Sequence, residues 1–120
     1  MTNSIRVLLS FLLLMTFSAH VLADCESPLT PIIPDGNVAS KDELVSAQKA
    51  MKNYQSSLVE FRDCLVGMQE ALDPEAEDIA VKTADIGMKF DSSVEAETKV
   101  AEEFNLAVRA YKARQAPVTE

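Results

Sequence analysis

One stretch decides the fold, SKDELVSAQKAMKNYQSSLVEFRDCLVGMQEAL, residues 40–72. Its apolar residues alternate spacings of three and four over four heptads: Leu44, Ala47, Met51, Tyr54, Leu58, Phe61, Leu65, Met68 and Leu72. This period predicts one amphipathic helix over residues 41–72, with coiled-coil-like packing along that row. Ser40 and Glu43 have the spacing of a capping box, which predicts the start of the helix.

A second helix is expected over residues 74–114, followed by a flexible tail, residues 115–120. Asp73 and Pro74 interrupt the first helix and form a favourable N-cap and first position for the next one. The expected apolar row of this helix is Ile79, Ile86, Phe90, Val94, Ala101, Phe104, Val108 and Tyr111. Asp91-Ser92-Ser93 is an alternative helix start that would make three helices of two, but no Gly or Pro enforces a break there.

A short connection makes two consecutive helices antiparallel neighbours, so the expected fold is an all-α antiparallel two-helix hairpin. Counting outward from the turn places Leu58 near Phe90. Glu97 interrupts the apolar row of the second helix, and at that level it could meet Lys49 or Lys52. We interpret this contact as a pair that sets the register of the two helices.

An N-terminal arm, residues 24–39, precedes the hairpin. Pro28, Pro31 and Pro34 recur every third residue, the period of a polyproline II helix. We expect the arm to be a tether docked on the hairpin; the alternative is that it serves as a ligand for an aromatic groove of another protein. In the docked arm, Ile32 and Ile33 are expected to cover the end of the second helix. Pro34-Asp35-Gly36 predicts a turn in which Gly36 can adopt a positive φ.

Residues 1–23 have the pattern of a signal peptide. Arg6 precedes an apolar run over residues 7–17, and Ala23 ends a cleavage-site sequence. The run is shorter than the roughly 20 residues of a membrane span. An uncleaved anchor is the alternative, whereas Asp24 disfavours a lipid anchor on Cys25. The expected location is therefore periplasmic or secreted, with no membrane association after cleavage.

Cleavage after Ala23 leaves 97 residues with ten Lys and Arg, nineteen Asp and Glu, and a net charge of −9. This charge disfavours nucleic acids and anionic lipid surfaces as partners. Cys25 and Cys64 are the two cysteines, and in an oxidising compartment such a pair predicts a disulfide that tethers the arm to the hairpin.

The residue inventory excludes most catalytic chemistry. The only histidine, His20, lies in the predicted leader, so the mature chain has no His-based nucleophile system, His-ligated metal or haem site. Three glycines cannot build a phosphate-binding loop, and no calcium-loop pattern is present. We therefore expect a non-enzymatic protein with no cofactor or metal.

Several motifs together are similar to those of a known family. This likeness rests on the N-terminal frame Cys-x2-Pro-x2-Pro-x2-Pro-Asp-Gly (residues 25–36) and on the capping box. It also rests on Ala47-Gln48, Tyr54, the second cysteine and the C-terminal stretch from Phe104 to Ala113. They resemble a family of small, uncharacterised secreted or periplasmic helical proteins of proteobacteria. The resemblance implies bacterial export, the helical hairpin and the cysteine pairing, and it implies no activity.

The expected function is that of an exported interaction or structural protein working through its helix faces. A second apolar row, Val45, Val59 and Val66, together with Met88, is the candidate surface for an unidentified protein partner or for dimerisation. Scattered apolar surface residues without a role are the alternative interpretation of this row. The alternative is a periplasmic chaperone or small-ligand carrier that binds apolar groups between helices. A secreted inhibitor or effector, acting through the arm or the turn, is a third class.

Overall fold

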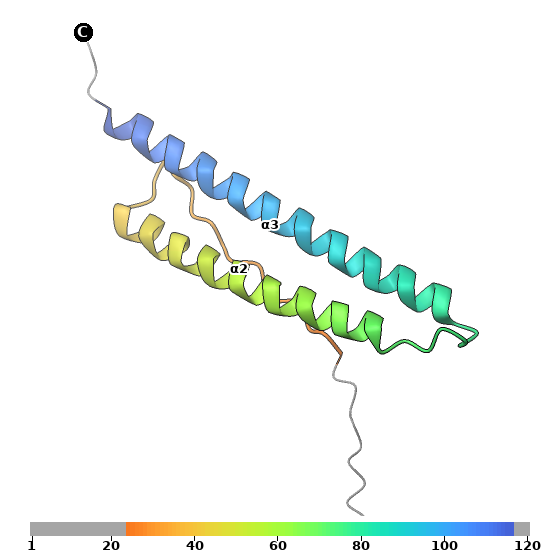
Figure 1. The fold of residues 1–120 in the computed structure, drawn as a ribbon. Coiled ribbons are helices and arrows are strands. Elements are labelled where there is room, and N and C mark those ends of the chain that lie inside the picture. The colour runs from red at the N-terminus through yellow and green to blue at the C-terminus, as the bar shows by residue number, and fades with distance from the viewer. Residues whose placement is uncertain (1–23, 117–120) are drawn as a thin grey trace, which may run out of the picture.

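The computed structural model describes residues 24–116 and contains two helices, α2 (Lys41–Glu70) and α3 (Ile79–Gln115). They run antiparallel and pack along their length, and the described range contains no strand (Figure 1). The predicted all-α hairpin is therefore confirmed. The predicted signal peptide and the last four residues of the predicted tail lie outside the described residues.

Helix α2 begins as the sequence predicts. The Ser40 hydroxyl accepts a hydrogen bond from the Glu43 backbone N–H, and the Ser40 N–H donates to the Glu43 carboxylate at 2.7 Å. Two of the N–H groups that a helix start leaves without partners are thereby satisfied. Most of the predicted apolar row is buried: Leu44, Ala47, Tyr54, Leu58, Phe61 and Leu65.

The connection between the helices is longer than predicted. Helix α2 ends at Glu70 and α3 begins at Ile79, whereas the sequence indicated residues 72 and 74. Asp73 causes the difference, because its carboxylate accepts from the Glu75 N–H at 2.9 Å and its carbonyl accepts from the Ala76 N–H at 3.1 Å. Asp73 therefore closes a separate turn instead of capping a helix.

The predicted apolar row of α3 is wrong in its middle. Phe90 and Val94 are 38% and 45% exposed, and the buried residues include Ser93, Val100 and Ala107 instead. Leu58 accordingly packs against Val100 and not near Phe90. The longer connection changes the register, and the arm covers one side of α3, so the buried side of α3 faces both α2 and the arm.

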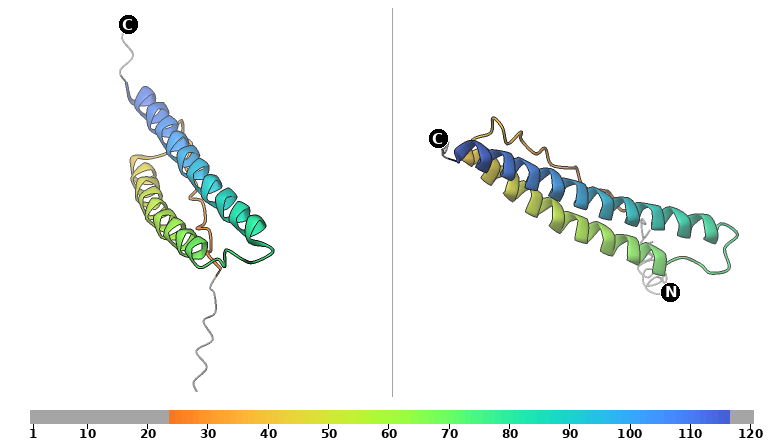
Figure 2. Two further views of the ribbon diagram at one scale, coloured as in Figure 1. Left: turned by 45° about the vertical axis from the view of Figure 1, so that its right-hand side comes forward. Right: turned by 90° about the horizontal axis from the view of Figure 1, so that it is seen from above.

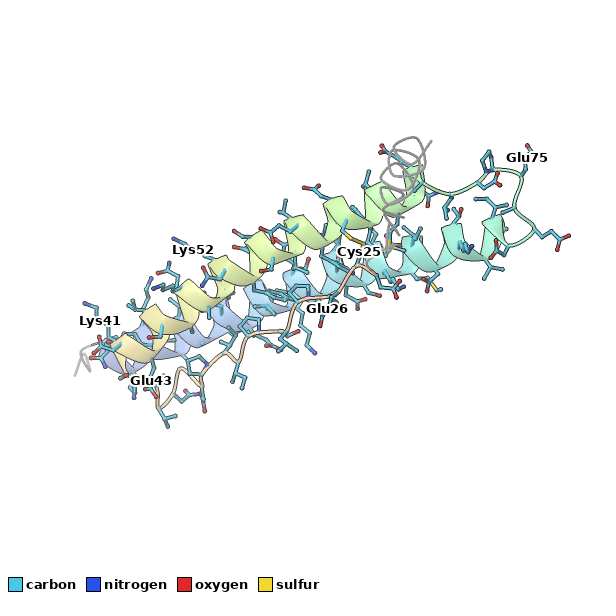
Figure 3. All side chains as sticks on the ribbon, turned by 90° about the horizontal axis from the view of Figure 1, so that it is seen from below. Cys25, Glu26, Lys41, Glu43, Lys52 and Glu75 are labelled. Carbon is cyan, nitrogen blue, oxygen red and sulfur yellow. A yellow bond between two sulfur atoms is a disulfide. The ribbon has the colours of Figure 1, made fainter. Side chains whose placement is uncertain are left out.

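The arm lies along one side of the hairpin, as Figure 2 shows. Cys25 and Cys64 form the predicted disulfide, which holds the start of the arm against α2 (Figure 3). Ile33 packs against two of the three core clusters, one with Leu44 and one with Leu58. Ile32 is 92% exposed, so the expectation that it helps to cover the end of α3 is wrong.

A tight turn ends the arm against α3. The Asp35 carboxylate accepts from the backbone N–H and the side-chain amide of Asn37, and the first of these bonds is the main reason that the Asp35 pKa lies below its ordinary value. Gly36 is buried here, and a Cβ at Gly36 would lie 1.8 Å from the Ala107 carbonyl oxygen. Its φ is not positive, so glycine is required for close approach and not, as predicted, for a left-handed turn.

Within residues 24–116, neither helix has an apolar segment long enough to cross a bilayer.

Candidate interaction surface

The hairpin has two long sides, and the arm occupies one of them. On that side Ser27 and Thr30 of the arm line a groove with Met88 and Ser92 of α3. Pro34 lines two further grooves, one against α2 and one against α3. The arm therefore acts as a third element of the fold, and its residues line all three of these grooves.

The other side of the hairpin carries a groove that no arm residue lines. It lies between the last two turns of α2 and the start of α3 and has a volume of about 490 Å³. Its lining is mainly apolar: Leu65, Val66, Ile86, Gly87 and Phe90, with Gln69, Glu70 and Thr83. It opens along its length to solvent and does not form an enclosed cavity.

Four exposed apolar side chains define what we call the arm-free face: Val59 and Val66 of α2, Phe90 and Val94 of α3. Val59 and Val66 are one heptad apart, and Phe90 and Val94 are four residues apart, so each pair shares one side of its helix. None of the four belongs to a core cluster of buried residues. The hairpin thus retains an apolar row that it does not need for its own core.

The structure does not bring the predicted surface residues Val45, Val59, Val66 and Met88 together on one side of the hairpin. All four are exposed, between 48% and 62%. Met88, however, lines the groove that holds Ser27 and Thr30, whereas Phe90 lines the groove with Val66. Two residues correspond to about 200° around a helix, so Met88 and Phe90 point to opposite sides of α3. Grouping Met88 with Val66 is therefore wrong.

Phe90 and Val94 belong to the surface but were predicted to lie in the core. The sequence carries no signal for this exchange, because a row of apolar residues on a helix looks the same whether a neighbour covers it or leaves it exposed. Only the position of the arm distinguishes the two sides of α3.

A polar cluster lies beneath the arm-free face. Arg62 Nη2 donates to Glu97 Oε2 at 2.6 Å and to the Ser93 carbonyl at 3.0 Å, and Arg62 Nε donates to Ser93 Oγ at 2.8 Å. The Arg62 guanidinium also lies 6.0 Å from the ring centroid of Phe90. Glu97 therefore forms an ion pair between the two helices, as the sequence predicts. Its partner is Arg62, so the predicted partners Lys49 and Lys52 are wrong.

Arg62 can reach Glu97 because it lies on the edge of the buried row of α2, next to Phe61. Its side chain is 17% exposed and that of Glu97 is 30% exposed, so water screens the pair only in part. The buried Ser93 hydroxyl donates to the Phe90 carbonyl at 2.6 Å, and its polar atom is therefore satisfied. The cluster links both helices at one level and holds Phe90 at the end of the groove.

The surroundings of the groove are acidic. Residues 63–78 contain six Asp and Glu and no Lys or Arg, and they form the end of α2 and the connection to α3. Glu70 lines the groove itself, and Asp91 and Glu95 directly follow Phe90 and Val94. At the opposite end of the hairpin, residues 109–114 carry three bases and no acid. Figure 3 shows Glu75 and Lys41 at these two ends.

The nearest lysines of α3 are engaged with acids of their own helix. Lys82 pairs with Asp78 at 2.9 Å, and the hydrogen bond from Lys82 is the main cause of the lowered Asp78 pKa. Lys89 pairs with Asp85 at 2.7 Å, and the hydrogen bond to Asp85 is the main cause of the raised Lys89 pKa. Over residues 24–116, Glu70, Asp91 and Glu95 form no ion pair, which leaves the rim of the groove negative.

Between residues 24 and 116, no group of three or more His, Cys, Asp or Glu side chains is arranged to hold a metal ion.

Fold and surface together define a disulfide-tethered helical hairpin with one side closed by its own arm and one side open. No protein-family model, curated protein or solved structure matches the chain.

Proposed function

We propose that this protein is a non-enzymatic, exported helical interaction protein whose working surface is the arm-free face. The observation that carries the proposal is the apolar row Val59, Val66, Phe90 and Val94, which the hairpin leaves exposed beside a mainly apolar groove. Exposed apolar patches of this kind on a soluble domain are typical of surfaces that bind other proteins.

Export is the part of the proposal that rests on the sequence. The leader pattern of residues 1–23 and cleavage after Ala23 direct the chain to the periplasm or the medium, where a disulfide can form. The disulfide between Cys25 and Cys64 is consistent with that location. The arm it tethers keeps one side of the hairpin covered, and the other side remains available to a partner.

A chaperone or carrier function is the second candidate. The volume of the groove, about 490 Å³, is within the range of small-molecule sites. Such sites enclose most of their ligand, whereas this groove is open along its length, and a small apolar molecule in it would stay largely hydrated. A polypeptide segment can cover the whole groove, so the geometry favours a protein partner.

Mass spectrometry under native and denaturing conditions tests this proposal. The full chain, expressed with its own leader in a Gram-negative host, should yield residues 24–120 less the two hydrogens lost to the disulfide, with a polypeptide as the only retained molecule. A retained small apolar molecule would support the carrier instead. A chain that keeps residues 1–23 would contradict export with cleavage.

A further inference from the structure

The groove of the arm-free face identifies its partner by shape and by charge. The buried residues Leu65 and Ile86 form its floor, the exposed Val66 and Gly87 line its edges, and Phe90 ends it beside Arg62. A flat protein surface could not reach this floor, because it lies between two helices. A third helix could enter between them, in the manner of an amphipathic helix that places its apolar side chains in a groove.

The spacing along the face suits such a helix. Val59 and Val66 are seven residues apart, which corresponds to about 10.5 Å along the α2 axis. The first and last anchors of a docking helix, at positions i and i+7, are separated by the same distance. Gly87 adds room on the α3 side, because no atom lies within 4 Å of the Cβ that another residue would have there.

The negative charge of the groove's rim favours a partner with positive charge. Asp63 and Glu70 on α2 and Asp91 and Glu95 on α3 are exposed beside the apolar row. Two copies of this chain meeting through the arm-free face would bring these acids together in either orientation, which disfavours a dimer. A helix with Lys or Arg on both flanks of its apolar stripe would instead meet acids on both sides.

We propose that this groove binds a basic amphipathic helix of a partner protein, with the apolar stripe of that helix over Val66 and Gly87 and its basic flanks toward Glu70 and Asp91. This inference rests on the proposed function and adds the chemical class of the partner.

Two glycine substitutions provide a matched test. Gly87 lies in the groove, whereas Gly67 lies outside its lining, and a Cβ would have open space at both positions. Gly87→Gln places a long, uncharged side chain in the groove, and Gly67→Gln adds the same side chain outside it and leaves the charge of the rim unchanged. Both substitutions replace a helical glycine with a better helix former, so both variants should fold.

Isothermal titration calorimetry with two 18-residue synthetic helices measures the binding. One probe has a leucine stripe flanked by lysines, and the other has the same stripe flanked by glutamates. The lysine probe should bind the oxidised full-length protein one to one, at least tenfold more tightly than the glutamate probe. Gly87→Gln should weaken binding at least tenfold because its side chain occupies the groove, while Gly67→Gln should leave binding within about twofold.

Equal binding of the lysine probe to both variants would overturn the groove assignment, because it would mean general attraction to an acidic surface. Tighter binding of the glutamate probe, or a dimer in sedimentation that Gly87→Gln dissociates, would overturn the basic partner but leave the arm-free face as the interaction surface. No binding of either probe, together with a retained small molecule in native mass spectra, would overturn both proposals.

Discussion

Arg62 of α2 and Glu97 of α3 form an ion pair at 2.6 Å that joins the two helices at one level. The same guanidinium donates to both oxygen atoms of Ser93 and lies against the ring of Phe90. A one-turn shift between the helices would break all of these contacts together. We therefore regard this cluster as the feature that fixes the register of the hairpin and the position of Phe90 in the arm-free face.

The coupling between Arg62 and Glu97 can be measured. Arg62→Met should lower the free energy of unfolding by about 1–3 kcal/mol, because it leaves partly buried polar groups without their charged partner. Glu97→Gln should cost less, and the double variant should reveal a coupling energy of about 0.5–3 kcal/mol in a urea double-mutant cycle. Strictly additive losses would mean that the ion pair does not set the register.

Gly36 should be intolerant of any side chain. Gly36→Ala places a Cβ against the backbone of Ala107, so the arm or α3 must move, and we expect a loss of about 1–3 kcal/mol. Gly67→Ala is the control, since its Cβ meets nothing and helix propensity should raise stability by about 0.5–1 kcal/mol. Urea midpoints give both values, and an unchanged midpoint for Gly36→Ala would argue against the close contact.

The two cysteine variants should behave alike. Cys25→Ser and Cys64→Ser each remove the same tether between the arm and α2, and each should cost about 4 kcal/mol through the loop-closure entropy of the unfolded chain. The double variant should lose no more than either single one. Clearly different single losses, or losses that add, would mean that each thiol contributes separately from the bond.

The capping box should make stability depend on pH. The hydrogen bond from the Ser40 backbone N–H lowers the Glu43 pKa, so the folded state favours the ionised carboxylate. The contribution of Glu43 is therefore complete above its unfolded pKa and disappears as the pH falls through the lower pKa of the folded state. In Glu43→Gln this part of the slope should be absent from urea unfolding measured across the acidic range. An identical slope in both proteins would exclude Glu43 as its source.

The sequence predicts α2 better than α3, and the reason is geometric. The row from Leu44 to Leu65 is covered by α3 and the arm, so its period translates directly into burial. On α3, Ser27 and Thr30 of the arm lie on the side of Ser92 and Ser93, while Phe90 on the other side has no such cover and stays exposed. Periodicity cannot reveal on which side of a helix an extended arm will lie.

The length of the connection between the helices and the partner of Glu97 could not be predicted from the sequence either. Asp73 followed by Pro74 is compatible with both a helix start and a separate turn, and the backbone hydrogen bonds of Asp73 select the turn. Glu97 could be identified as an interruption of the apolar row, but its partner depended on a register that shifted with the longer connection. The disulfide, by contrast, followed from the cysteine count alone.

Site-specific photo-cross-linking in the cell envelope tests the central claim most directly. A photoreactive phenylalanine derivative at position 66 lies on the arm-free face, and the same residue at position 88 lies on the arm side, where the native Met88 is more exposed than Val66, 62% against 48%. We predict that position 66 gives a discrete adduct whose cross-linked peptide belongs to a basic amphipathic helix, and that position 88 does not. Equal adducts from both positions, or adducts from position 88 alone, would contradict the assignment of the arm-free face as the working surface.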